Sequence, residues 1–187
     1  YSLSYNTERT YDSGTFRLNA YAIESRLDLF SDFTYNLDDP SPANADQFEQ
    51  SEHRKVFGLS TSRSFNGKIG EIDSVNTLGA QLRHDRIDPV GLYSSVARAR
   101  SSTTQEARVR ETSIGIYGEN STQWTSWFRS VAGLRYDRFN FDVTSSIPVN
   151  SGKKDAAITS PKLALIFGPW NNTEDFINYG YRFHSND

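Results

Sequence analysis

The stretch YAIESRLDLFSDFTY, residues 21–35, alternates apolar and polar residues with a period of two. Every second residue from Tyr21 is apolar or serine, and the residues between them include the charged set Glu24, Arg26, Asp28 and Asp32. This period is typical of a β-strand with one apolar and one wet side. Strands of soluble domains usually run about five or six residues. The long alternation therefore favours a strand that crosses a membrane, with lipid on its apolar side and a watery lumen on its charged side.

The bulk composition fits this interpretation. The chain has 187 residues, a net charge of −3, no cysteine and no methionine. These values exclude a disulfide framework and a thiolate metal site, and they give no reason to expect a nucleic-acid partner. No apolar run is long enough for a transmembrane helix, but a membrane barrel averages out to a polar composition. Because the first residue is Tyr1 and not Met, we expect the chain to be cut from a longer polypeptide.

The same alternation recurs along the chain and predicts an all-β fold. We expect about eight antiparallel strands over residues 1–6, 15–35, 52–65, 71–85, 111–120, 126–142, 158–167 and 174–183. No segment has the apolar stripe of an amphipathic helix. The prediction is a segment of an antiparallel transmembrane β-barrel.

The expected connections alternate between short and long. The short ones are 66–70, 121–125 and 168–173, and the long polar ones are 36–51, 86–110 and 143–157. The first short one contains Asn66-Gly67, which favours a tight hairpin. Short turns would thus gather at one end of the sheet and long loops at the other, as in outer-membrane barrels with short periplasmic turns and long extracellular loops. Trp124, Trp127 and Trp170 lie at or beside the short turns, where a barrel carries an aromatic girdle.

No motif in the sequence indicates an enzyme. A His-Glu-x-x-His pattern, a Gly-x-Ser-x-Gly elbow and a glycine-rich phosphate loop are all missing. We interpret His53, His84 and His184 as exposed or hydrogen-bonded surface residues. The sequence therefore predicts no catalytic residue, no cofactor and no metal site.

The stretch from Asp38 to Glu49 has acids at both ends, like a calcium-binding loop. Its interior does not fit, because Pro40 and Pro42 stand where such a loop places ligands. We expect a solvated acidic loop, with a loosely held calcium ion as the alternative.

The segment 86–110 is rich in arginine and could attract an anionic ligand at a barrel mouth. Tyr93, Arg98 and Arg100 are the residues that we expect to contact such a ligand. The alternatives are contact with lipopolysaccharide phosphates, or simple solvation of a long loop.

Several stretches together resemble one known family. They are GLRYD (133–137), SPKLALIFGPW (160–170), NYGYRFHSND (178–187), RLNAYAIESRLDLFSDFTYNLDDP (17–40) and DQFEQ (46–50). They are similar to the barrel of TonB-dependent outer-membrane receptors, which have about 22 strands and an N-terminal plug. The resemblance implies that residues 1–187 are part of one such barrel domain, with the plug and the other strands absent.

This resemblance also implies a function, which is active import of a scarce nutrient such as a ferric siderophore across the outer membrane of a Gram-negative bacterium. The implied partners are a small-molecule ligand, outer-membrane lipid and lipopolysaccharide, and the TonB complex, which would act through the missing plug. Two other classes share part of the pattern. A passive porin shares the alternation and the girdle, whereas a soluble β-sandwich binding module shares only the strands.

Overall fold

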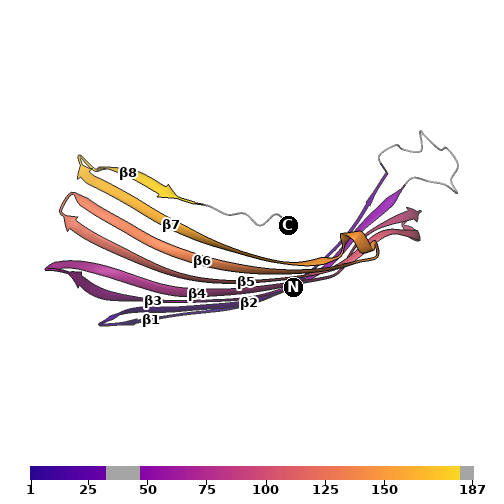
Figure 1. The fold of residues 1–187 in the computed structure, drawn as a ribbon, viewed down its shortest axis with the longest axis horizontal. Helices are drawn as coiled ribbons and strands as arrows, with labels where there is room; N and C mark the ends of the chain where they lie inside the picture. The colour runs from indigo at the N-terminus through magenta and orange to yellow at the C-terminus, as the bar shows by residue number, and fades with distance from the viewer. Residues whose placement is uncertain (33–46, 182–187) are drawn as a thin grey trace.

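The computed structural model describes residues 1–32 and 47–181, and these form a single curved sheet (Figure 1). Eight antiparallel strands follow one another in chain order, so each strand pairs with its sequence neighbours. The strands are β1 (Ser2–Tyr11), β2 (Gly14–Ser31), β3 (Phe48–Ile69), β4 (Ile72–Val96), β5 (Ala99–Thr125), β6 (Phe128–Ser145), β7 (Gly152–Trp170) and β8 (Thr173–Gly180). One 3-10 turn, η2 (Pro148–Asn150), precedes β7. The all-β antiparallel prediction and the expected number of strands are confirmed.

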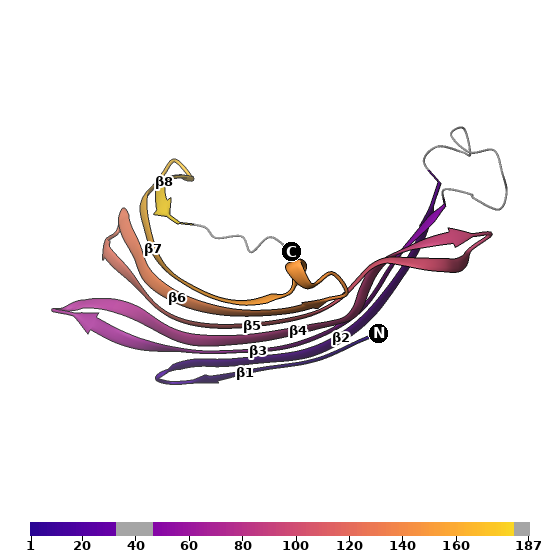
Figure 2. The same cartoon turned by 45° about the vertical axis from the view of Figure 1, so that its right-hand side comes forward.

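The sheet bends like a section of a cylinder wall (Figures 1 and 2). Within the described residues, β1 pairs only with β2 and β8 pairs only with β7, so these two strands form its edges. The strands are long, in agreement with the long alternation of apolar and polar residues in the sequence. β5 has 27 residues, which at about 3.3 Å per residue extends for roughly 90 Å.

Four two-residue turns lie at one end of the sheet, here called the short-turn end. They are residues 12–13, 70–71, 126–127 and 171–172. The prediction that short connections gather at one end is confirmed. However, Asn66-Gly67 is not a turn, because both residues pair with β4, and the chain reverses at Gly70, whose φ of +61° suits glycine.

The prediction of a long loop over residues 86–110 is wrong. β4 continues to Val96, β5 begins at Ala99, and only Ala97 and Arg98 form the turn between them, with φ of +49° and +64°. Two positive φ values define a turn that usually carries Asn-Gly, so Ala-Arg gave no signal for it. The β4–β5 ladder also shifts register three times between Ile87 and Ser95, and such bulges interrupt the period of two in the sequence.

The other two predicted loops have different outcomes. The segment 36–51 falls mostly outside the described residues, as does the acidic stretch from Asp38, and β3 already begins at Phe48. The segment 143–157 shrinks to residues 146–151, which include η2. The turn 97–98 and the segment 146–151 both lie at the end opposite the short turns, called the far end below.

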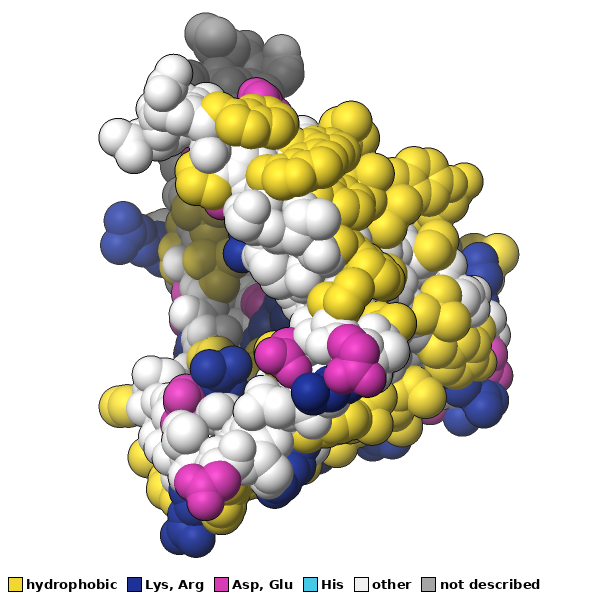
Figure 3. Space-filling view, turned by 90° about the vertical axis from the view of Figure 1, so that its left-hand side faces the viewer, with side chains coloured by type: hydrophobic (Ala, Val, Ile, Leu, Met, Phe, Trp, Pro, Cys, Tyr) yellow, Lys and Arg dark blue, Asp and Glu magenta, His cyan; other side chains and the backbone are white. Residues whose placement is uncertain are grey.

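The convex face of the sheet carries a continuous band of apolar side chains. Residues that oppose each other across a ladder share a face, so the register traces this band from strand to strand. The apolar band comprises Leu3, Tyr5, Ala20, Ala22, Phe57, Leu59, Leu78, Ala80, Leu82, Ile114, Ile116, Leu134, Tyr136, Leu163, Leu165, Ile177 and Tyr179. Figure 3 shows most hydrophobic side chains on this outer side, whereas polar and charged ones line the hollow side. Ile116 is 56% exposed and Leu134 is 57% exposed.

The register reverses the faces that the sequence suggested for residues 21–31. Glu24 and Arg26 share the face of Ala22, which belongs to the apolar band, and they extend it toward the far end. Tyr21 instead opposes Gly58 on the concave, polar face. The placement of the charged set in the lumen is therefore wrong where the register covers it. A period of two identifies two faces but not which one turns inward, and this part of β2 passes beyond the apolar band.

Aromatic side chains gather at the short-turn end, as predicted. Trp127 lies in the turn between β5 and β6 and stacks on Phe167, with ring centroids 6.5 Å apart. Phe128 stacks on the same Phe167 ring at 5.2 Å. Trp170 is the last residue of β7 and is 50% exposed, and Trp124 lies one residue before the end of β5. These rings have the amphipathic position typical of a membrane interface.

Candidate functional site

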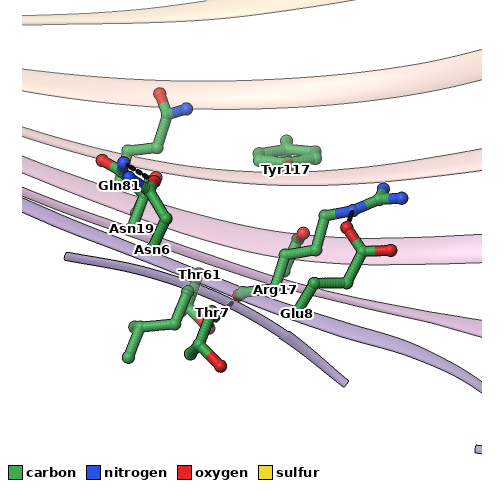
Figure 4. Close-up of a pocket in the computed structure, with 11 residues that line it drawn as sticks. Asn6, Thr7, Glu8, Arg17, Asn19, Thr61, Gln81 and Tyr117 are labelled. Atoms are coloured by element: carbon green, nitrogen blue, oxygen red, sulfur yellow. Dashed lines mark hydrogen bonds and ion pairs between the residues drawn. The ribbon is translucent and has the colours of Figure 1, made fainter. Parts of the chain in front are cut away.

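The concave face holds a hollow of about 480 Å³ that spans β1 to β5 and lies toward the short-turn end of β2, β3 and β5 (Figure 4). Its polar lining comes from side chains that share one face of the sheet: Asn6, Glu8, Arg17, Asn19, Ser60, Ser62, Gln81 and Tyr117. Arg17 donates to Glu8 over 2.9 Å, and Asn19 donates to the side chain of Asn6. The surface therefore offers amide and hydroxyl groups with its charges already paired, which suits a wetted wall and not a reaction centre.

Two tyrosines on the concave face lie flat over glycines of the neighbouring strand. Tyr117 covers Gly79 and Tyr21 covers Gly58, and each pair is directly opposed in the ladder. A Cβ added at residue 79 would lie only 2.3 Å from Cζ of Tyr117. These glycines are thus required for close aromatic packing along the wall.

Two arginine–aspartate pairs stiffen the same face. Arg83 donates to Asp85 over 2.7 and 2.9 Å, and Arg135 donates to Asp137 over 2.7 and 2.6 Å. Each pair joins residues two positions apart, which lie on the same side of a strand. Asp85 is only 6% exposed. Bidentate geometry of this kind fixes both side chains of each pair against the wall.

A second concave hollow, of about 350 Å³, lies nearer the far end. Its concave-face lining mixes apolar and amide side chains: Leu27, Gln50, Glu52, Val90, Leu92, Gln105 and Ala107. Glu52 is held by Arg54 over 2.8 Å. Such a mixture of apolar surface with a few convergent polar groups is the usual lining of a small-molecule site.

The structure brings together two of the three predicted ligand-contact residues. The guanidinium carbon of Arg100 lies 3.9 Å from the centroid of the Tyr93 ring. Two guanidinium N–H groups of Arg100 donate to the Glu49 carboxylate over 2.6 and 2.7 Å. Tyr93 is 2% exposed and donates its hydroxyl to Glu106 over 2.8 Å. By register this cluster lies on the face of the apolar band and beyond it, not on the concave face.

The third predicted residue, Arg98, lies apart from this cluster in the turn between β4 and β5. Its backbone N–H donates to Gln47 over 2.9 Å, and its guanidinium lies 5.8 Å from the centroid of the Phe30 ring. Arg98 is exposed at the far end, whereas Tyr93 is buried and Arg100 is paired. Contact of these residues with a ligand stays a prediction.

Electrostatics explain how the Tyr93 cluster is held. Hydrogen bonds from Arg100 lower the pKa of the Glu49 carboxyl, and the opposing charge adds to this effect. Burial raises the pKa of the Tyr93 phenol, and its bond to Glu106 acts in the same direction. Near neutral pH the carboxylate is therefore ionised and the phenol protonated, which is the state that the observed hydrogen bonds require.

Glu49, Glu106 and the residues of the two hollows were missed by the sequence reasoning. Glu49 lies 51 residues from its partner Arg100, so only the strand pairing joins them. The hollow-lining residues belong to ordinary alternating strands, and no local motif distinguishes them from other wall residues.

The two histidines that the structure describes each contact one polar side chain of a neighbouring strand. His53 contacts Glu24 over 2.8 Å, His84 contacts the Thr112 hydroxyl over 2.8 Å, and His184 lies outside the described residues. Within residues 1–32 and 47–181, no group of three or more His, Asp and Glu side chains is placed to hold a metal ion. In the same part of the chain, no helix is both long and apolar enough to cross a bilayer.

Comparison with known families gives one match over nearly the whole chain. Residues 1–186 match the family described as TonB dependent receptor-like, beta-barrel. The chain therefore belongs to the TonB-dependent receptor β-barrel family, and the resemblance noted in the sequence is confirmed. A search of curated proteins gave no match.

Solved structures share the fold at low sequence identity. The ferric citrate transporter FecA in its unliganded form has a TM-score of 0.76 and 11% identity, with 96% of this chain and 26% of that chain covered. The ferric-catecholate import receptor Fiu from E. coli K12, in an open form, has a TM-score of 0.67 and 11% identity, with 96% and 34% covered. The copper transporter OprC has a TM-score of 0.60 and 13% identity, with 91% and 28% covered. The chain thus spans about a quarter to a third of the length of these structures.

Proposed function

We propose that this chain is the wall of an outer-membrane, TonB-dependent active transporter that imports a scarce nutrient such as a ferric siderophore. The observation that carries the proposal is the apolar band, which crosses all eight strands on the convex face of a chain in this receptor family. Lipid would cover the band and water would fill the concave side. The cargoes named for the structural neighbours are ferric citrate, ferric catecholate and copper, which supports a metal-bearing nutrient.

The domain proposal is that residues 1–187 are part of one barrel, completed by further strands and a plug elsewhere in a longer polypeptide. The open edges at β1 and β8 support it, because an unpaired strand edge leaves backbone groups without partners. In lipid such an edge would cost several kcal/mol for each unsatisfied group. The fraction of the neighbouring structures that this chain spans agrees with the same proposal.

The proposed partners follow from this role. They are the TonB complex acting through the plug, a small-molecule ligand, and outer-membrane lipid with lipopolysaccharide. We expect no covalent chemistry from this wall, and the strong ion pairs on its concave face are structural.

For ligand contact we propose Arg98 first among the three predicted residues, because its guanidinium is exposed at the far end. Tyr93 and Arg100 would act indirectly, by holding the β4–β5 hairpin whose turn carries Arg98. The concave hollow lined by Leu27, Val90 and Leu92 faces the transport path and is the second place for such contact.

The alternative classes differ in testable ways. A soluble sandwich needs two packed sheets, and the described residues form only one, so the fold does not support it. A passive porin has a barrel wall of the same kind, but it transports its solutes without energy from TonB.

The test is uptake of iron-55 chelates by cells that carry the full-length gene, with and without TonB. Ferric citrate and a ferric catecholate are the two probes. Uptake that needs both the gene and TonB supports the proposal. Uptake that needs the gene but persists without TonB would instead identify a passive pore, and recovery of the protein in the soluble fraction would overturn both readings.

A further inference from the structure

Four polar side chains interrupt the convex face near the short-turn end, and we call Ser74, Asn76, Asn120 and Thr122 the amide cluster. Asn76 opposes Asn120 and Ser74 opposes Thr122 in the β4–β5 ladder, on the face of Leu78. The Asn120 amide nitrogen donates to the Asn76 side-chain oxygen over 2.9 Å, and the Thr122 hydroxyl donates to the Asn120 side-chain oxygen over 2.7 Å. A hydrogen-bonded group of this kind is unexpected on a face that otherwise carries the apolar band.

The amide cluster lies at a depth where we expect hydrocarbon. Asn120 precedes Trp124 by four residues, which is about 13 Å along the strand or roughly 9 Å in height at a tilt of about 45°. Because Trp124 lies among the aromatic side chains of the short-turn end, Asn120 lies on the bilayer side of that level. Its neighbours on the same face are apolar, since Asn76 opposes Phe65 on β3 and Asn120 opposes Ala132 on β6. Polar groups are rare at such a position and usually contact another polar group.

The hydrogen bonds inside the amide cluster leave polar groups unused. Asn76 uses its side-chain oxygen for Asn120, and its amide N–H groups have no partner among the described residues. The Asn120 side-chain oxygen accepts one bond, from Thr122, although an amide oxygen can accept two. Ser74 is 4% exposed, and its hydroxyl also has no hydrogen-bond partner in the described part of the chain. The cluster therefore retains a free donor at Asn76 and a free acceptor at Asn120.

Small residues beside the amide cluster make room for the close approach of another surface. Gly67 opposes Ser74, and a Cβ added at Gly67 would lie 2.7 Å from the Asn76 amide nitrogen. Ala132 opposes Asn120 on the other side. Small residues let membrane-embedded segments approach one another closely, and asparagine side chains hydrogen-bond across such contacts. A partner surface can therefore reach the two amides.

We propose that the convex face at the amide cluster binds a second copy of this chain, with a two-fold axis along the membrane normal. In this dimer the Asn76 amide nitrogen of each copy donates to the Asn120 side-chain oxygen of the other. The cluster supplies both the free donor and the free acceptor, so it is complementary to itself, as a two-fold interface between identical chains requires. An axis along the membrane normal also keeps both copies in the same orientation in the bilayer. This inference rests on the membrane position of the apolar band in the proposed function.

The experiment measures dimerisation of the full-length protein in liposomes, by single-molecule photobleaching of a singly labelled sample over a series of protein-to-lipid ratios. The variant Asn76→Leu/Asn120→Leu removes both intermolecular hydrogen bonds and places apolar side chains against lipid. We expect wild type to form dimers and the variant to dimerise about tenfold more weakly. The matched control is Asn6→Leu/Asn19→Leu, which removes a hydrogen-bonded amide pair of the same kind from the concave face and should leave dimerisation unchanged.

Monomers at every protein-to-lipid ratio would overturn the inference, and so would dimers of equal strength in wild type and the Asn76→Leu/Asn120→Leu variant. Quenching of tryptophan fluorescence by brominated lipid separates this failure from failure of the proposed function. Quenching with monomers alone refutes the dimer only, whereas absence of quenching refutes the membrane position as well. Because leucine suits a lipid-facing position, the variant should show the same quenching as wild type, and a loss of dimers then does not come from misfolding.

Discussion

The convex and concave faces of this sheet are built from the same strands but obey different rules. On the convex face, the apolar band places side chains such as Ile116 and Leu134 in the open, 56% and 57% exposed. On the concave face, charges are paired within the strand and glycines make room for tyrosines, as at Gly79 under Tyr117. The convex face depends on its surroundings for stability, whereas the concave face pairs charges such as Arg83–Asp85 and Arg135–Asp137 within the protein.

This difference predicts how the free-energy cost of a substitution depends on the face that carries it. A substitution on the convex face changes contact with the lipid that we propose covers this face. Its free-energy cost therefore depends on how close the residue lies to the centre of the bilayer. A change on the concave face acts through specific neighbours, so its cost depends on contact geometry. Pairs of substitutions at adjacent residues separate the two effects, because adjacent residues of a strand point to opposite faces.

The largest effect is expected from Ala80→Arg, at the middle of the apolar band. Ala80 opposes Thr61 on β3 and Ile116 on β5. A charged side chain at mid-bilayer costs a membrane barrel about 2 to 4 kcal/mol. The free energy of unfolding of the full-length protein in liposomes, followed by denaturant titration, measures this loss.

The control for this change is Gln81→Arg, one residue along the chain and on the concave face. Gln81 lines the wetted hollow, so its replacement should change the unfolding free energy by less than about 0.5 kcal/mol. Equal losses at residues 80 and 81 would contradict the division of the sheet into a lipid face and a water face.

A smaller effect is expected from Gly79→Ala, because the added Cβ would lie 2.3 Å from Cζ of Tyr117. The ring must shift, and overpacking of this kind costs about 1 to 3 kcal/mol. Denaturant unfolding and the near-ultraviolet circular dichroism of the tyrosines would report the change.

Its control is Gly118→Ala on the convex face, where the new Cβ would meet only the flexible end of Leu78 at 3.3 Å. We expect a change below about 0.5 kcal/mol there. If both alanines were tolerated equally, the Tyr117–Gly79 packing would not be a constraint on the wall.

The smallest expected loss comes from Asp137→Asn, which weakens the bidentate pair with Arg135. The Asp137 side chain is 13% exposed, so its loss of charge leaves a half-buried guanidinium poorly matched, at a cost of about 1 to 2 kcal/mol. The exposed convex pair Arg138–Asp155, at 3.9 Å, is the comparison, and Arg138→Gln should cost less than about 0.5 kcal/mol. A larger loss from Arg138→Gln in the same unfolding assay would reverse the ranking of the two faces.

Much of the architecture could be predicted from local patterns. The alternation located all eight strands, and the turn at Asn171-Asn172 fell inside a predicted short connection because asparagine tolerates positive φ. The tryptophans marked the short-turn end correctly. The hairpin at Ala97-Arg98 was missed because its residues give no turn signal and because bulges interrupt the alternation of its strands.

The candidate site was less accessible to sequence reasoning. Tyr93 and Arg100 were singled out for their chemistry, but their partners Glu49 and Glu106 follow only from pairing across β3, β4 and β5. The arginine-rich character of residues 86–110 was visible, yet the separation of Arg100 from Arg86, Arg108 and Arg110 depends on bulges in the β4–β5 ladder that shift the register.

The sequence alone determined the fold class, the number of strands, the gathering of three short connections at one end and the family, because each depends on short-range periodicity or on local motifs. Only the tertiary structure decided which face of each strand is convex, and it placed Glu24 and Arg26 outside where alternation had suggested the lumen. The physical reason is that a period of two is symmetric between the faces. The symmetry is broken only when neighbouring strands pair in register and the sheet curves.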